Sequence, residues 1–163
     1  MSELLFNELP RPTFRWLRVN HTVSSLAGED TAVQSIAVEA NKDILSPLPV
    51  GTALLDGNYE GANKEAVHVL VEKAEGYAIN VPPKAKEVVG IRIDANARVA
   101  NRFQFIVGEG AELEVQFYVT GSGDALTNVS YLNEYDVKEA GKVVVKKVNL
   151  LPEHVQQDRK SVV

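Results

Sequence analysis

Short runs of alternating apolar and polar residues fill the chain from about Tyr77 to Leu151, and polar or glycine-containing turns separate them. Alternation with a period of two is typical of a β-strand that buries one face. No long helical run interrupts the series, which excludes an alternating βαβ arrangement. The predicted strands are Tyr77–Val81, Val88–Ile93, Phe103–Val107, Leu113–Val119, Val129–Val137 and Val143–Leu150.

Part of this region repeats. The segment Val107–Val115 resembles Val137–Val145 at a constant offset of 30 residues, and each unit is a strand, a polar turn with small residues and a second strand. A fixed period in this range is typical of stacked architectures, because one unit cannot bury its apolar side alone. The pattern therefore predicts a mainly β fold, either a β-helix-like stack of short strands or a β-sandwich or jelly roll.

The first 76 residues predict an N-terminal arm and a mixed α/β segment. We expect a short helical turn over Glu3–Pro10, stopped by proline, and an amphipathic helical segment over Thr13–Asn20. The lone tryptophan, Trp16, lies in that segment and is expected to anchor the arm to the body. A helix over Asn63–Glu75 is favoured because Gly76 follows it, although the three valines at 67, 69 and 71 also alternate as in a strand.

The expected organisation has three segments. Residues 1–76 form the arm and mixed segment, residues 77–151 the β-helix-like repeat core, and residues 152–163 a polar C-terminal tail. We expect the tail either to fray or to cover the open end of the β stack.

The composition of the chain argues against several classes of function. Seventeen basic and 22 acidic residues give a net charge of −5, which disfavours nucleic acid as the main partner. The chain has no cysteine, so disulfides, thiolate nucleophiles and cysteine-ligated metal clusters are excluded within it. The N-terminus lacks the basic start and apolar run of a signal peptide, and no stretch approaches membrane-spanning length, so we expect a cytoplasmic protein.

The residues that carry catalytic or metal chemistry form no convincing site. Three histidines are widely separated, and neither Gly108–Gly110 nor Gly121–Gly123 opens a helix after a strand, as a phosphate-binding loop would. On a strand, Glu112 and Glu114 point away from Leu113 and therefore look like a solvated face. We predict no catalytic residue, no metal site and no cofactor. The histidine and glutamate side chains that could carry metal or acid–base chemistry are His21, His68, His154, Glu109, Glu112 and Glu114.

Several segments resemble SufB/SufD-type iron–sulfur cluster assembly proteins. The stretch Asn7–Pro10 followed by Thr13–Asn20 is similar to the N-terminal arm of short members of that family. Gly76–Pro82 resembles the segment that enters the family's core, and Phe105–Leu113 resembles its strand–turn–strand. Leu126–Val129 and the strand that ends at Val148–Leu150 lie where the next coil would be.

The resemblance implies a right-handed parallel β-helix that serves as a scaffold with a SufC-type ATPase and a larger SufB/SufD-type subunit. In the family, a functional cysteine and an ATPase-binding helical region lie late in the chain. This sequence has no cysteine, so no family site residue is carried over. An accessory subunit, a degenerate paralogue or an N-terminal fragment would each fit the resemblance.

Two function hypotheses follow. The first is a non-enzymatic scaffold or accessory subunit of Suf-type cluster assembly that acts through protein–protein contacts. The second is a small-ligand or carbohydrate-binding β module in which Trp16 and either Tyr118 or Tyr131 provide a stacking platform. An enzyme ranks third, because no catalytic constellation is present. Unpaired strand edges at an open end of the stack also predict end-to-end or edge-to-edge self-association into a homo-oligomer.

Overall fold

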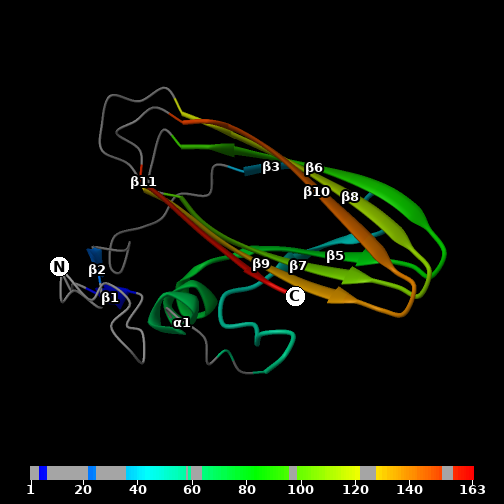
Figure 1. Ribbon diagram of the computed structural model, residues 1–163, viewed down its shortest axis with the longest axis horizontal. Helices are drawn as coiled ribbons and strands as arrows, with labels where there is room; N and C mark the ends of the chain where they lie inside the picture. Colours follow the sequence, from blue (N-terminus) through cyan, green and yellow to red (C-terminus); the bar gives the residue numbers. More distant parts are fainter. Residues whose placement is uncertain are drawn as a thin grey trace, which may run out of the picture.

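The computed structural model describes residues 4–6, 22–24, 36–57, 59, 64–95, 99–121, 128–151 and 156–163. The described chain is mainly β, with two mixed sheets that lie as two layers and one helix beside them (Figure 1). The strand-rich prediction for the chain is therefore confirmed.

The first layer is a four-stranded sheet, and the second is a five-stranded sheet. In spatial order the four-stranded sheet contains β10 (Lys142–Leu150), β8 (Glu112–Thr120), β6 (Lys86–Asp94) and β3 (Ile36–Glu39). The five-stranded sheet contains β11 (Gln156–Val162), β9 (Asn128–Val137), β7 (Val99–Val107), β5 (Gly76–Val81) and β4 (Leu45–Leu48).

From β5 to β11 the chain alternates between the two layers, and each of these strands pairs in parallel with the next strand of its own sheet. Lys86 lies beside Glu112, and Glu112 lies beside Lys142. In the five-stranded sheet, β9 pairs in parallel with both β7 and β11. The pairing of β8 with β10 has a register offset of 30 residues, as Glu112↔Lys142 shows. The 30-residue sequence repeat therefore corresponds to the step from β8 to β10, and the same offset separates β7 from β9 in the other sheet.

At one side of the stack the parallel order ends in two short antiparallel strands. β3 pairs antiparallel with β6, and β4 pairs antiparallel with β5. The sheets thus draw strands from the segment before residue 77 and from the segment after residue 151, as well as from the repeat region between them.

The main core lies between the two layers. Alternate residues of β6, β7, β8 and β9 point inward, and Phe103, Phe105, Phe117 and Tyr131 have at most 2% of their surface exposed. The Phe117 ring stacks on Tyr131 at a centroid distance of 5.7 Å and meets Phe103 edge-on at 5.8 Å. Aromatic pairs in these geometries add to the stability that their buried area provides.

Three successive tight turns carry the chain from the five-stranded to the four-stranded sheet, and one position in each adopts a left-handed backbone. These positions are Lys84 (φ 61°), Gly110 (φ 63°) and Ala140 (φ 56°). The turns also bond to each other, because the Lys84 amide donates to the Glu109 carbonyl and the Gly110 amide to the Glu139 carbonyl. The stacking of the strands therefore continues through the turns.

The helix prediction near Asn63 is confirmed, since α1 spans Lys64–Lys73. Val67 and Leu70 of α1 form a buried cluster with Leu132 of β9, and Ala74, just after the helix, belongs to it. The helix therefore covers part of the outward side of the five-stranded sheet. Gly76 then starts β5 in direct contact with the backbone of β7, and a Cβ at this position would overlap the Arg102 carbonyl oxygen. The glycine thus allows the close approach of β5 and β7, while α1 already ends at Lys73.

Near the N-terminus one prediction is wrong, and near the C-terminus the structure selects between two alternatives. Leu4–Phe6 is a strand, β1, that pairs antiparallel with β2 (Thr22–Ser24), where a helical turn was expected. The polar tail was expected either to fray or to cover the open end of the strands; it contains β11, which covers the edge of β9 in the five-stranded sheet, so the second alternative agrees with the structure. The expected helical segment Thr13–Asn20, with Trp16, lies outside the described residues.

Candidate functional site

The outer face of the four-stranded sheet is the candidate site. Along β8 the inward residues Leu113 and Val115 are buried, whereas Glu112 and Gln116 point outward and are exposed. The even-numbered residues of β6 and β10 share that outward direction, because both strands pair with β8 in register. We use the name outer face for these residues and for the neighbouring residues Ala37 and Glu39 of β3.

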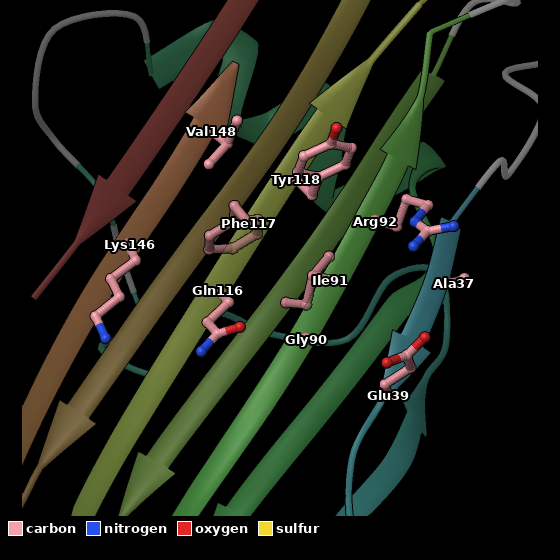
Figure 2. A pocket seen from close by; sticks show the side chains of 10 residues that line it. All are labelled: Ala37, Glu39, Gly90, Ile91, Arg92, Gln116, Phe117, Tyr118, Lys146 and Val148. Carbon is pink, nitrogen blue, oxygen red and sulfur yellow. The ribbon is translucent and has the colours of Figure 1, made fainter. Parts of the chain in front are cut away.

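A hollow of about 420 Å³ lies in this face (Figure 2). Side chains from four neighbouring strands line it, and Figure 2 shows Glu39 and Lys146 on opposite sides of it, with Gln116 between them. The lining residues are Ala37, Glu39, Gly90, Ile91, Arg92, Gln116, Phe117, Tyr118, Lys146 and Val148.

The absence of a side chain at Gly90 leaves room for the hollow. Gly90 lies beside Glu39 on one side and beside Gln116 on the other. The nearest atom to a Cβ placed on Gly90 would be the Glu39 Cβ at 3.6 Å, which is ordinary van der Waals contact. A larger side chain at this position would therefore project into the hollow.

Charged groups surround the hollow and are partly paired with each other. The Lys146 Nζ lies 2.8 Å from Glu114 Oε2, and the Gln116 amide donates to Glu114 Oε1 at 2.6 Å. These two hydrogen bonds, that from Lys146 above all, hold the pKa of Glu114 below its usual value. The Arg92 guanidinium lies 6.0 Å from the centre of the Tyr118 ring, within the range of a cation–π contact.

Large apolar side chains are also exposed on the outer face. Val88 and Leu150 each have 57% of their surface exposed, and Val148 has 47%. Tyr118 is 40% exposed and lies directly beside Val148 in the strand register. With Val144, these residues make up five of the eight large apolar residues recorded as exposed in the described part of the chain. The exposed apolar surface is thus concentrated on one face.

The predicted stacking residues have different positions. Tyr118 lies in the hollow, but Tyr131 is fully buried in the core with the Lys147 Nζ 5.2 Å from its ring centre. The prediction that Tyr131 provides an exposed stacking platform is therefore wrong, because its ring lies in the core between the two layers and has no face open to a ligand. Trp16 lies outside the described residues.

The other candidate residues do not come together. His68 is exposed on α1, while His21 and His154 are outside the described residues. Glu109 lies in a turn and Glu112 on the outer face, where Glu112 pairs with Lys86 at 3.1 Å. Within the described residues no group of three acidic or histidine side chains is arranged to hold a metal ion.

Sequence reasoning did not single out Glu39, Gly90, Arg92, Gln116 and Lys146. The alternation in β6, β8 and β10 does place four of them on the polar face of a strand. Their proximity, however, depends on pairing between residues far apart in the chain, which no local pattern records.

Comparisons with protein-family models, with curated proteins and with solved structures find no match to this chain. The similarity to SufB/SufD-type proteins accordingly stays a prediction based on the short segments quoted above. In the described residues, no helix has the length and apolar character required to cross a membrane.

Proposed function

We propose that this chain is a non-enzymatic scaffold that binds another protein on the outer face of its four-stranded sheet. The concentration of exposed apolar side chains on that face carries the proposal, because large apolar patches on a folded domain commonly mark interaction sites. In this proposal the parallel stack is a right-handed β-helix-like coil, and its regular register provides a rigid platform.

The charge pattern of the outer face supports a protein partner. Four basic and four acidic side chains alternate around the apolar residues, so the face has no excess of either sign. A polyanion such as nucleic acid would be attracted by an excess of positive charge, whereas protein interfaces combine apolar area with a mixed polar rim. The charged residues are Lys86, Arg92, Lys142, Lys146, Glu39, Asp94, Glu112 and Glu114.

The partners that fit the sequence resemblance are a SufC-type ATPase and a larger SufB/SufD-type subunit. Each can be tested directly as a purified protein. Binding of either one to the full chain, measured by calorimetric titration, is the expected result. Failure of both to bind would remove the Suf-type assignment and leave the interaction face to be tested by itself.

A pair of variants tests the face. Val148, on β10, and Val50, in a loop away from this sheet, are exposed to nearly the same extent, 47% and 45%. Affinity capture from the source cells, with wild type, Val148→Glu and Val50→Glu as baits, compares equal chemical changes at the two places. We expect a protein that wild type and Val50→Glu retain and Val148→Glu loses. Equal capture by all three baits, or none by wild type, contradicts the proposal.

A second candidate function is favoured by Tyr118. Its ring is 40% exposed inside a hollow that also contains Arg92 and Gln116, and an aromatic ring beside hydrogen-bonding groups is a common way to bind sugars or other small polar ligands. A thermal-shift screen of sugars with wild type and Tyr118→Ala tests this function. A ligand that stabilises wild type and not the variant supports it, and a screen without a stabilising sugar excludes it.

A further inference from the structure

Four residues form one straight row across the outer face. Glu39 pairs in register with Gly90, Gly90 with Gln116, and Gln116 with Lys146. Neighbouring strands are ~4.8 Å apart, so the acidic and basic ends of the row are separated by roughly 14 Å. The row therefore has a negative end, a gap, a projecting amide and a positive end, in that order.

Two other rows also place complementary side chains on the two halves of the sheet. The next row toward the ends of the parallel strands contains Ala37, Arg92, Tyr118 and Val148. At the beginning of the strands, Lys86 lies beside Glu112. In these rows the residue on one half of the sheet has chemistry that complements the residue on the other half, whereas the row of Val88, Glu114 and Val144 sets apolar residues beside a carboxylate that Lys146 pairs with.

Resting on the proposed function of this face, we propose that its partner is a second copy of this chain, bound face to face about a two-fold axis. The axis runs parallel to the strands, midway between β6 and β8. Such an axis places β6 of one copy over β8 of the other, and β3 over β10. A two-fold interface requires one surface to be complementary to itself, and these rows meet that condition.

The contacts across this axis follow from the register. Glu39 faces Lys146 of the second copy, and the Gln116 side chain enters the gap that Gly90 leaves. In the next row Arg92 faces the Tyr118 ring of the second copy, and Ala37 faces Val148. Every one of these contacts occurs twice, which doubles its contribution to specificity.

The groups at the two ends of the row are accessible for this contact. Among the ion pairs recorded for the described residues Glu39 has none, and its side chain is exposed. Lys146 forms an ion pair with Glu114, but 61% of the Lys146 side chain remains exposed. An ammonium group has three donors, so Lys146 can keep Glu114 and also bind a carboxylate of the second copy.

Edge-to-edge association through β10 is less favourable. This strand lies at the edge of the four-stranded sheet and contains three lysines and no acidic residue. Two such edges would bring like charges together, and lysines on an edge strand commonly prevent that kind of pairing. The outer face, by contrast, has equal numbers of both charges. Three strands of nine residues and one of four present roughly 500 Å² per copy, so a dimer buries about 1,000 Å², the lower limit for a specific interface.

Charge exchange between Glu39 and Lys146 tests the arrangement. In Glu39→Lys, two lysines meet at both contacts, and in Lys146→Glu two glutamates meet. We expect each variant alone to be a monomer of about 17.8 kDa by light scattering at micromolar concentrations, whereas wild type has twice that mass. The equimolar mixture of the two variants and the double variant Glu39→Lys/Lys146→Glu are both expected to recover the dimer, because each then pairs opposite charges.

Two further variants separate this contact from general effects. Lys138→Glu makes the same charge change at a turn lysine that is also paired to a carboxylate at 2.8 Å and is 57% exposed, so it is expected to stay dimeric. Gly90→Leu fills the gap and is expected to be a folded monomer. Circular dichroism establishes folding for every variant.

The inference is overturned if wild type is monomeric throughout the micromolar range, if either single variant remains a dimer, or if the folded variants do not form a dimer when mixed. These results are distinguishable from failure of the proposed function. A monomeric wild type that still captures a protein through Val148 contradicts the second copy as partner and keeps the outer face as an interaction site.

Discussion

Arg102 and Glu134 form an ion pair in the interior, with the arginine Nη2 2.9 Å from Glu134 Oε2 and side-chain exposures of 0% and 3%. Both residues lie on the outward side of the five-stranded sheet, where the loop that contains Thr52 and Leu55 covers them. The arginine also donates to the Thr52 carbonyl at 2.7 Å, and Glu134 accepts from the Leu55 amide at 2.8 Å. The pair therefore attaches that loop to the sheet.

Removal of the carboxylate from this pair is expected to destabilise the fold. Glu134→Ala leaves the Arg102 guanidinium buried without its counter-charge, and breaking a buried pair in this way costs ~3–5 kcal/mol. Urea unfolding measures the change in free energy, and hydrogen exchange at the Leu55 amide measures release of the loop. Asp136→Asn, which breaks the exposed pair with Lys138, is the control and is expected to cost less than ~1 kcal/mol. Equal losses for the two variants would contradict this role of the buried pair.

Ala140→Gly is expected to stabilise the protein. Ala140 adopts φ 56°, a left-handed conformation that costs a residue with a Cβ ~1–2 kcal/mol and costs glycine little. The greater flexibility of glycine in the unfolded chain offsets part of this gain. We therefore expect the free energy of unfolding, measured by heat or urea, to increase by ~0.5–1 kcal/mol. Gly110→Ala, at the equivalent position of the preceding turn, is expected to lower stability by a similar amount. A loss of stability in Ala140→Gly would refute the argument.

Neighbouring aromatic residues of β8 are expected to respond very differently to truncation. Phe117 has 2% of its surface exposed and packs on Tyr131 and Phe103, so Phe117→Ala is expected to lose ~3–5 kcal/mol. Tyr118 points to the opposite face and is 40% exposed, so Tyr118→Ala is expected to lose ~1 kcal/mol or less. Urea unfolding of both variants, at a concentration where the chain is monomeric, tests the inward and outward assignment of this strand. Similar losses would contradict it.

The pKa of Glu114 reports directly on its hydrogen bonds. Lys146 and Gln116 lower this pKa, so Lys146→Ala is expected to raise it toward the usual glutamate value, as measured by NMR titration of the side-chain carboxyl. Because the folded-state pKa is the lower one, the stabilisation is present above the usual glutamate pKa. The stabilisation is lost as the pH falls from the usual glutamate pKa to below the lowered pKa of Glu114 in the folded state. An unchanged Glu114 titration in the variant would exclude the ion pair in solution.

Strand positions in the repeat region were predictable from the sequence. All six predicted strands are present, and the 30-residue offset matches the register between β8 and β10. The start of β7 was missed because Asn101 and Arg102 interrupt the apolar pattern. These polar residues are fully buried, since β7 has the core on one side and a covering loop on the other. A strand covered on both faces does not show the alternation that burial of one face produces.

The strands at the two ends of the chain were not predictable in the same way. β1 has three residues, and β11, with the sequence QQDRKSV, is polar along most of its length. What makes β11 a strand is its parallel pairing with β9, a backbone interaction that requires no apolar pattern. Local preference is a weak guide where the neighbouring strand supplies most of the order.

The sequence by itself determined the alternating strands, the helix before Gly76 and the 30-residue repeat, because burial of one face repeats at the period of each element. The tertiary structure alone decided which side chains share a surface. Glu39 and Lys146 lie 107 positions apart in the chain, yet they end one row of the outer face. Backbone hydrogen bonds between distant strands set that register, and no residue's local neighbourhood in the chain encodes it.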